Sequence, residues 1–192
     1  MDKRMILVIG GARSGKSSFA QGLASESGRK VCFVATAEAR DGEMDERIHH
    51  HRQARPADWC TLELEGGTVL GDLPEKVELA LLDCFTVYLS NLMAASGLDW
   101  PVEEEDLMPE DEVLRHMGDC ESEALEITDR LRDAADTLIV VSNEVGTGVV
   151  PPYRLGRIFR DLAGRLNQRL AERADKVFLV VAGLPVSIKG GE

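Results

Sequence analysis

The feature that most constrains the fold is a glycine-rich segment near the N-terminus, Gly10-Gly11-Ala12-Arg13-Ser14-Gly15-Lys16-Ser17. It fits the pattern G-x-x-x-x-G-K-[ST], a loop whose backbone N–H groups surround phosphate oxygens. The apolar run at residues 5–9 predicts a buried parallel strand before it, and residues 18–25 predict the start of a helix after it. The alternative is a chance glycine-rich turn, and the predicted strand before the segment and helix after it argue against that alternative. The sequence therefore predicts a P-loop that binds a nucleoside triphosphate.

The polar residues of this segment suit phosphate chemistry. The ammonium of Lys16 can reach the β- and γ-phosphates, and the hydroxyl of Ser17 can ligate Mg²⁺. The positive end of the helix dipole adds to the attraction for phosphate. Residues 79–82 form an apolar run that ends in Asp83. This is the Walker B pattern for a carboxylate that binds Mg²⁺ directly or through water, although a strand-end cap would have the same pattern.

Apolar runs also predict the fold class. Core strands are expected at residues 5–9, 31–35, 77–82, 137–141 and 176–181, and helices at 113–135 and 162–174. The connections are long enough for crossover helices, so the chain is predicted to be α/β, with a mostly parallel sheet flanked by helices. Residues 99–112 carry eight carboxylates and two prolines, which favours a solvated loop or helix entry over a metal site.

Length and charge exclude several classes of protein. The 192 residues fit one domain, and the net charge of −12 argues against non-specific nucleic-acid binding, which needs a basic face. We expect no membrane span, because no apolar window is long enough, and no signal peptide, because the first apolar run leads directly into the P-loop. The four cysteines show no C-x-x-C pairing, which favours a reducing, cytoplasmic location.

Three of the four histidines are adjacent, at His49, His50 and His51. They lie in a predicted helix, residues 41–55, that follows the strand end at 35–37, where α/β sheets bind ligands. At about 100° per residue, His51 falls on the apolar stripe of this helix, whereas His49 and His50 point elsewhere. Adjacent histidines do not converge on a metal ion, but a neutral imidazole can attack phosphorus. A structural role and a catalytic role both stay open.

Other polar residues have two interpretations each. Glu63 alone indicates a surface acid, and Asn143 and Glu144 follow a predicted strand either as turn residues or as part of an active-site rim. Arginines gather after Pro151-Pro152, at Arg154, Arg157, Arg160, Arg165 and Arg169. They predict a solvated helix face, or a surface that meets phosphates or the acidic groups of a neighbouring subunit.

Together these motifs resemble one family, the bifunctional adenosylcobinamide kinase/adenosylcobinamide-phosphate guanylyltransferases of cobalamin synthesis. The resemblance runs nearly from end to end. It is carried by the P-loop, Ala35-Thr36-Ala37, Arg47-Ile48-His49-His50-His51-Arg52, Arg55-Pro56, Trp59, Asn143-Glu144-Val145-Gly146, Arg154-Leu155-Gly156-Arg157, Phe159-Arg160-Asp161 and Gly164-Arg165-Leu166-Asn167-Gln168-Arg169. A general P-loop kinase would not share the later motifs.

The resemblance implies two reactions. The enzyme would phosphorylate the aminopropanol hydroxyl of adenosylcobinamide with ATP or GTP. It would then attach GMP from GTP to a histidine, with release of pyrophosphate, and transfer that GMP to the phosphorylated cobinamide. The resemblance also implies Mg²⁺, a RecA-like P-loop fold and a homotrimer.

The resemblance further implies which residues act. The nucleophile would be His50, the first histidine of the pair that follows Arg-Ile-x. Nucleotide contacts would come from Gly10, Gly11, Ala12, Arg13, Ser14, Gly15, Lys16, Ser17, Ala35, Thr36, Ala37, His51, Arg52, Gln53, Ala54, Glu63 and Asp83. Asp83 departs from the family pattern, in which a glutamate is expected at this strand end.

Two alternatives remain from the residues themselves. A monofunctional P-loop kinase for a small molecule would use the P-loop and leave the histidines structural. A nucleotide-binding regulatory subunit would bind the triphosphate without turnover.

Overall fold

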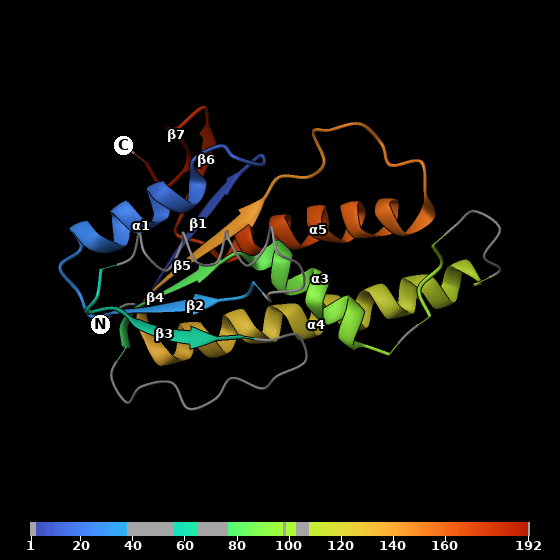
Figure 1. The fold of residues 1–192 in the computed structure, drawn as a ribbon, viewed down its shortest axis with the longest axis horizontal. Coiled ribbons are helices and arrows are strands. Elements are labelled where there is room, and N and C mark those ends of the chain that lie inside the picture. The colour runs from blue at the N-terminus through green and yellow to red at the C-terminus, as the bar shows by residue number, and fades with distance from the viewer. Residues whose placement is uncertain (1–2, 38–55, 65–76, 98, 103–107, 192) are drawn as a thin grey trace.

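The computed structural model describes residues 3–37, 56–64, 77–97, 99–102 and 108–191. These ranges contain a seven-stranded sheet with the strand order β3-β2-β4-β5-β1-β6-β7 (Figure 1). The strands are β1 (Arg4–Gly10), β2 (Val31–Ala35), β3 (Cys60–Glu63), β4 (Val77–Asp83), β5 (Ala135–Asn143), β6 (Lys176–Val181) and β7 (Leu184–Lys189). All pairs are parallel except β6 with β7. The predicted α/β class with a mostly parallel sheet is confirmed.

Helices cover both faces of the sheet (Figure 1). They are α1 (Lys16–Glu26), α3 (Phe85–Ala95), α4 (Glu110–Ala134) and α5 (Arg154–Arg173). Side chains alternate along β1, so that Val8 packs in the cluster that includes α1, whereas Leu7 and Ile9 pack in the cluster that includes α3, α4 and α5. Within the described ranges, no helix combines the length and the apolar character that a bilayer crossing requires.

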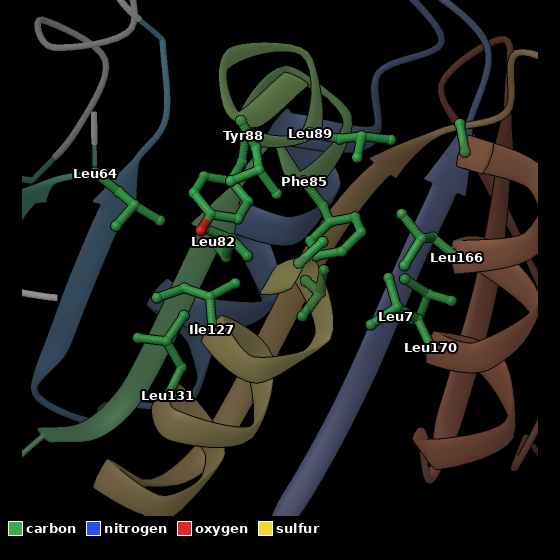
Figure 2. Close-up of a cluster of buried hydrophobic side chains, with 14 of the residues drawn as sticks. Leu7, Leu64, Leu82, Phe85, Tyr88, Leu89, Ile127, Leu131, Leu166 and Leu170 are labelled. Atoms are coloured by element: carbon green, nitrogen blue, oxygen red, sulfur yellow. The ribbon is translucent and has the colours of Figure 1, made fainter. Parts of the chain in front are cut away.

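The larger core lies between the sheet and α3, α4 and α5 (Figure 2). Leu7 of β1 and Leu82 of β4 meet Phe85 of α3, Leu131 of α4 and Leu166 of α5, and each of these side chains is at most 1% exposed. Burying one such side chain stabilises the fold by about 1.5–3 kcal/mol. The core therefore fixes β1, β4 and the start of α3, which are the elements that carry the candidate site.

Most of the predicted elements are present. Strands occupy the five predicted apolar runs, and α1, α4 and α5 cover the predicted helices, although α5 already begins at Arg154 rather than at residue 162. β3, α3 and β7 were not predicted. The helix predicted for residues 41–55 lies outside the described residues.

In the acidic segment at 99–112, residues 99–102 are irregular and residues 110–112 begin a helix, so both predicted forms, loop and helix entry, are present. Pro109 precedes α4, and Glu110, Asp111 and Glu112 form its first turn. Carboxylates at this end of a helix interact favourably with the positive end of the helix dipole. The three carboxylates at residues 110–112 thus help to stabilise the start of α4.

Candidate active site

The P-loop connects β1 to α1, and its backbone requires glycine at both ends. A Cβ on Gly10 would lie 2.6 Å from the Ser14 Oγ and 2.6 Å from the carbonyl oxygen of Val180. Gly15, which precedes α1, has a φ of 93°, in the left-handed region that favours glycine. The loop therefore passes too close to β6 at Gly10 for any side chain, and it turns into the helix through a conformation that suits glycine.

A second segment supports the loop from the far end of the sequence. The N–H of Gly183, in the turn between β6 and β7, donates a hydrogen bond of 2.8 Å to the carbonyl oxygen of Ser14. The Gly183 Cα would be 3.1 Å from a Cβ placed on Gly15. The β6–β7 turn thus packs directly against the P-loop.

Lys16 is the first residue of α1 and is only 8% exposed. Its Nζ donates a hydrogen bond of 3.1 Å to the carbonyl oxygen of Gly11. The side chain therefore folds back over the loop, so that its ammonium lies at the position where the loop would enclose phosphate.

Ser17 and Asp83 are in contact, although α1 follows β1 and Asp83 ends β4, and these two strands are not neighbours in the sheet. The Ser17 hydroxyl, in the first turn of α1, donates a hydrogen bond of 3.2 Å to Asp83 Oδ1. Asp83 ends β4, and β5 separates β4 from β1. A hydroxyl and a carboxylate oxygen are the hard ligands that Mg²⁺ prefers, so this donor pair fits a magnesium ion that also binds nucleotide phosphates.

Parallel register brings the other predicted residues to the same edge of the sheet. Ala35 of β2 pairs with Asp83 on one side and with Glu63 on the other. Gly10 of β1 pairs with Asn143 of β5. Because the carboxyl ends of parallel strands meet at one edge, the P-loop, residues 35–37, Glu63 and Asp83 share that edge.

Thr36 links β2 to the segment after β4. Its hydroxyl donates a hydrogen bond of 2.9 Å to the carbonyl oxygen of Cys84 and accepts one of 2.8 Å from the Cys84 N–H. Asn91 of α3 donates a hydrogen bond of 2.8 Å to the Thr36 carbonyl oxygen. Thr36 is 1% exposed, so its side chain holds the edge together from inside.

The end of β5 is fixed by a second set of buried polar contacts. The Asn143 Nδ2 donates a hydrogen bond of 2.9 Å to the hydroxyl of Thr86. Asn167 of α5 donates one of 3.0 Å to the Asn143 carbonyl oxygen and accepts one of 2.7 Å from the Ser142 hydroxyl. The N–H of Glu144 donates a hydrogen bond of 3.0 Å to the Gly10 carbonyl oxygen. Asn143 and Glu144 therefore form part of the P-loop rim rather than a separate turn.

The Cys84 thiol stays protonated at neutral pH. Burial raises its pKa, and the negative charge of the adjacent Asp83 raises the pKa further. Its Sγ lies 3.1 Å from the hydroxyl of Thr86. Cys84 therefore acts here as a hydrogen-bonding neighbour, since only a thiolate would be an effective nucleophile.

The arginines after Pro151-Pro152 lie in two kinds of surroundings, and Arg165 belongs to both. Arg165 and Arg169 lie 3.7 and 3.4 Å from the carboxylate of Glu121 on α4, so both pair within the chain. Arg154, Arg157, Arg160 and Arg165 line a cavity between α4 and α5. The prediction of a solvated helix face therefore does not cover the arginines that line the cavity.

Several predicted residues lie outside the described part of the chain: His49, His50, His51, Arg52, Gln53 and Ala54. Conversely, the site contains Thr86, Asn91 and Asn167, which sequence reasoning missed. Thr86 and Asn91 have a weak signal, because they lie in the largely apolar helix α3. Asn167 belongs to the motif at residues 164–169 that carries the resemblance, but the motif gave this residue no role.

Comparison with known proteins finds similarity over nearly the whole chain. The model of the cobinamide kinase/cobinamide phosphate guanyltransferase family matches residues 6–188. The chain is 44% identical over 186 residues to the bifunctional adenosylcobalamin biosynthesis protein CobP of Pseudomonas aeruginosa, with 96% of each chain covered. It is 40% identical over 188 residues to the bifunctional adenosylcobalamin biosynthesis protein CobU of Escherichia coli, covering 96% of this chain and 99% of the relative.

Proposed function

This chain belongs to the cobinamide kinase/cobinamide phosphate guanyltransferase family, a family of transferases, and we propose that it carries out both reactions in one active site. It would phosphorylate the aminopropanol hydroxyl of adenosylcobinamide with ATP or GTP and then transfer GMP from GTP to the new phosphate, giving adenosylcobinamide-GDP. The observation that carries this proposal is the arrangement of Lys16, Ser17 and Asp83 at one sheet edge, in a chain that the family matches over residues 6–188.

In the kinase step, the P-loop residues Gly10–Ser17 would bind the triphosphate. Backbone N–H groups and the Lys16 ammonium would neutralise charge that develops on the transferred phosphoryl group. The buried hydroxyl of Ser14 has no hydrogen-bond partner among the described residues, and a phosphate oxygen would satisfy it. The substrate hydroxyl attacks the γ-phosphorus, a P–O bond to the substrate forms, and the nucleoside diphosphate leaves.

Ser17 and Asp83 would hold Mg²⁺ through the Ser17 hydroxyl and the Asp83 carboxylate, which already meet at 3.2 Å. When bound, the ion supplies charge neutralisation on the phosphate oxygens. The shorter side chain of Asp83, in place of the expected glutamate, would reach the ion directly or through water.

In the guanylyltransferase step, we assign the nucleophile to His50 from the family resemblance. Its neutral imidazole nitrogen attacks the α-phosphorus of GTP, an N–P bond forms, and pyrophosphate leaves. A phosphate oxygen of the phosphorylated cobinamide then attacks the same phosphorus and breaks the N–P bond. Splitting one transfer into two in this way lowers each barrier. Ala35, Thr36, Ala37, His51, Arg52, Gln53, Ala54 and Glu63 would contact the nucleotide.

The experiment that tests this proposal follows the α-phosphate. Protein incubated with Mg²⁺ and GTP labelled at the α-phosphate should retain acid-labile, alkali-stable label after denaturation. The label should be lost in His50→Ala and retained in His49→Ala, its neighbour. A monofunctional kinase would transfer label only from the γ-phosphate to cobinamide. Absence of α-label from wild-type protein that is active as a kinase would therefore favour the monofunctional alternative.

We also propose a homotrimer in the cytoplasm. The trimer rests on the family resemblance, and light scattering coupled to size-exclusion chromatography tests it through the molar mass. The cytoplasmic location is supported by the four cysteines, all of which are free thiols.

A further inference from the structure

A cavity of about 720 Å³ lies between the start of α4, residues 110–117, and the larger part of α5, residues 154–168. Its apolar wall includes Val113 and Met117 of α4 and Ile158 of α5. Figure 1 shows that the first turns of α4 and α5 reach past the carboxyl ends of the parallel strands. The cavity therefore opens beyond the same edge of the sheet that carries the P-loop.

The cavity is joined to the P-loop by a short stretch of chain. Gly10 and Asn143 are register partners, which places their strands about 4.8 Å apart. Gly146, which lines the cavity, follows Asn143 by three residues, and three residues span at most about 11 Å. The Arg160 Nη2 donates a hydrogen bond of 3.1 Å to the Gly146 carbonyl oxygen. One wall of the cavity is therefore tied to the rim of the phosphate site.

The lining combines apolar surface with an excess of positive charge. Its charged members are four arginines and two carboxylates, namely Arg154, Arg157, Arg160, Arg165, Glu110 and Asp161. Arg154 pairs with Glu110 in the lining, and Arg165 pairs with Glu121 outside it. This local excess stands out in a chain whose net charge is −12. A guanidinium carries five N–H donors in a rigid fork, which suits carbonyl and phosphate oxygens. The cavity thus fits a large ligand that has apolar faces and many oxygen acceptors.

We propose that this cavity binds the acceptor of the two transfers, a corrin-type macrocycle with amide side chains. The proposal rests on the function proposed above. The apolar faces of the ring would pack against Leu114, which is 51% exposed, and against the small exposed parts of Val113, Met117 and Ile158. Its amide carbonyls would accept hydrogen bonds from Arg157 and Arg160. After the first transfer, the same guanidiniums would attract the new phosphate. The ring would then lie beside the P-loop, with its aminopropanol arm directed toward the nucleotide.

The first test fills the cavity without disturbing the fold. Gly164 of α5 lines the cavity, and a Cβ placed on it would meet nothing within 4 Å. Leucine also favours a helix over glycine, so Gly164→Leu should fold. We expect it to raise the KM for cobinamide in the kinase step by about tenfold or more, with the KM for ATP unchanged. Gly164→Ala, which adds only a methyl group, should change the KM for cobinamide much less.

The second test removes a donor. Arg160→Gln should raise the KM for cobinamide about tenfold, the loss expected for one charge-assisted hydrogen bond. Attachment of GMP to the enzyme from GTP alone should be unchanged, because that half-reaction needs no acceptor. The control is Arg173→Gln, since Arg173 pairs with Asp129 in the last turn of α5, away from the cavity.

The outcomes separate this inference from the proposed function. If wild-type protein turns over cobinamide and neither Gly164→Leu nor Arg160→Gln changes its KM, the acceptor binds elsewhere and the inference fails. If the KM for ATP rises instead, the cavity serves the nucleotide and the inference also fails. If wild-type protein shows no turnover of cobinamide with ATP, it is the proposed function that fails.

Discussion

Ser17 of α1 donates a hydrogen bond of 3.2 Å to Asp83 of β4, across the end of the intervening strand β5. This contact joins the helix after the P-loop to the carboxyl end of β4. It places a hydroxyl oxygen and a carboxylate oxygen side by side. The metal-dependent phosphoryl transfer that we propose would use this pair of oxygen atoms at this edge of the sheet.

Replacing Asp83 should separate metal binding from folding. In Asp83→Asn the amide oxygen can still accept the Ser17 hydrogen bond, but the charge that attracts Mg²⁺ is lost. We expect kcat of both reactions to fall by about 10²-fold or more, with little change in the melting temperature. Asp83→Glu, which keeps the carboxylate, should retain most activity. Steady-state kinetics over a range of Mg²⁺ concentrations measures the effect, and full activity of Asp83→Asn would contradict the assignment.

Lys16 should matter for both reactions, because both use the triphosphate. Lys16→Ala is expected to lower kcat/KM for the nucleotide by about tenfold or more in each step, through the loss of a charge-assisted contact. Lys30→Ala, which removes an exposed lysine outside the site, is the matched control. An unchanged rate in either step would show that Lys16 does not contact phosphate in that step.

Gly10 should be irreplaceable for steric reasons. In Gly10→Ala the new Cβ would meet the Val180 carbonyl oxygen at 2.6 Å, and backbone cannot move aside as a side chain can. We expect the free energy of unfolding to fall by about 1–3 kcal/mol in urea denaturation. Gly11→Ala is the control, because a Cβ there would meet nothing within 4 Å. Equal stability of the two variants would refute the close approach of the loop to β6.

Asn167 should contribute stability through buried hydrogen bonds. Asn167→Ala leaves the Ser142 hydroxyl and the Asn143 carbonyl oxygen without their partner on α5. Leaving such buried groups unsatisfied should lower the free energy of unfolding by about 1–3 kcal/mol. Gln168→Ala, at the next and exposed position of α5, should change it by less than about 0.5 kcal/mol. Thermal or urea unfolding decides between these outcomes.

Cys32 should make the fold less stable at high pH. Burial raises the pKa of its thiol from 9.0 to about 12, and the neighbouring Cys60 adds to the shift. Between these two values an unfolded chain loses the proton whereas the folded chain keeps it, so the free energy of unfolding falls as pH rises above about 9. Cys32→Ala should flatten this slope. An identical pH dependence in wild type and variant would contradict the shift.

Local patterns were enough to predict the strand, the helix and the acidic strand end that surround the P-loop. The P-loop, the apolar run of β1 and the acid at the end of β4 are each contiguous in sequence, so their geometry follows from short-range rules. β3 was missed because it has only four residues, alternately half-buried and exposed, and β7 because its six residues are all exposed. Neither strand shows the apolar run that identified the others.

The remaining part of the site depends on tertiary packing. Thr36, Asn91 and Cys84 belong to three different segments, and their hydrogen bonds exist only because β2, β4 and α3 meet at one edge. Likewise, the cavity between α4 and α5 needs two helices that are separated in sequence by β5. No spacing of residues along the chain signals such a meeting, which explains why the sequence does not predict the hydrogen bonds of Asn91 and Asn167.

The hydrogen bond from Gly183 to Ser14 has a consequence for synthesis on the ribosome. The P-loop is translated well before the β6–β7 turn, so one of its backbone contacts can form only after that turn has emerged from the exit tunnel. A nascent chain therefore cannot assume the complete loop geometry while most of its domain is still being made. Until the β6–β7 turn has been made and has folded, the P-loop of a nascent chain lacks this hydrogen bond to the Ser14 carbonyl oxygen.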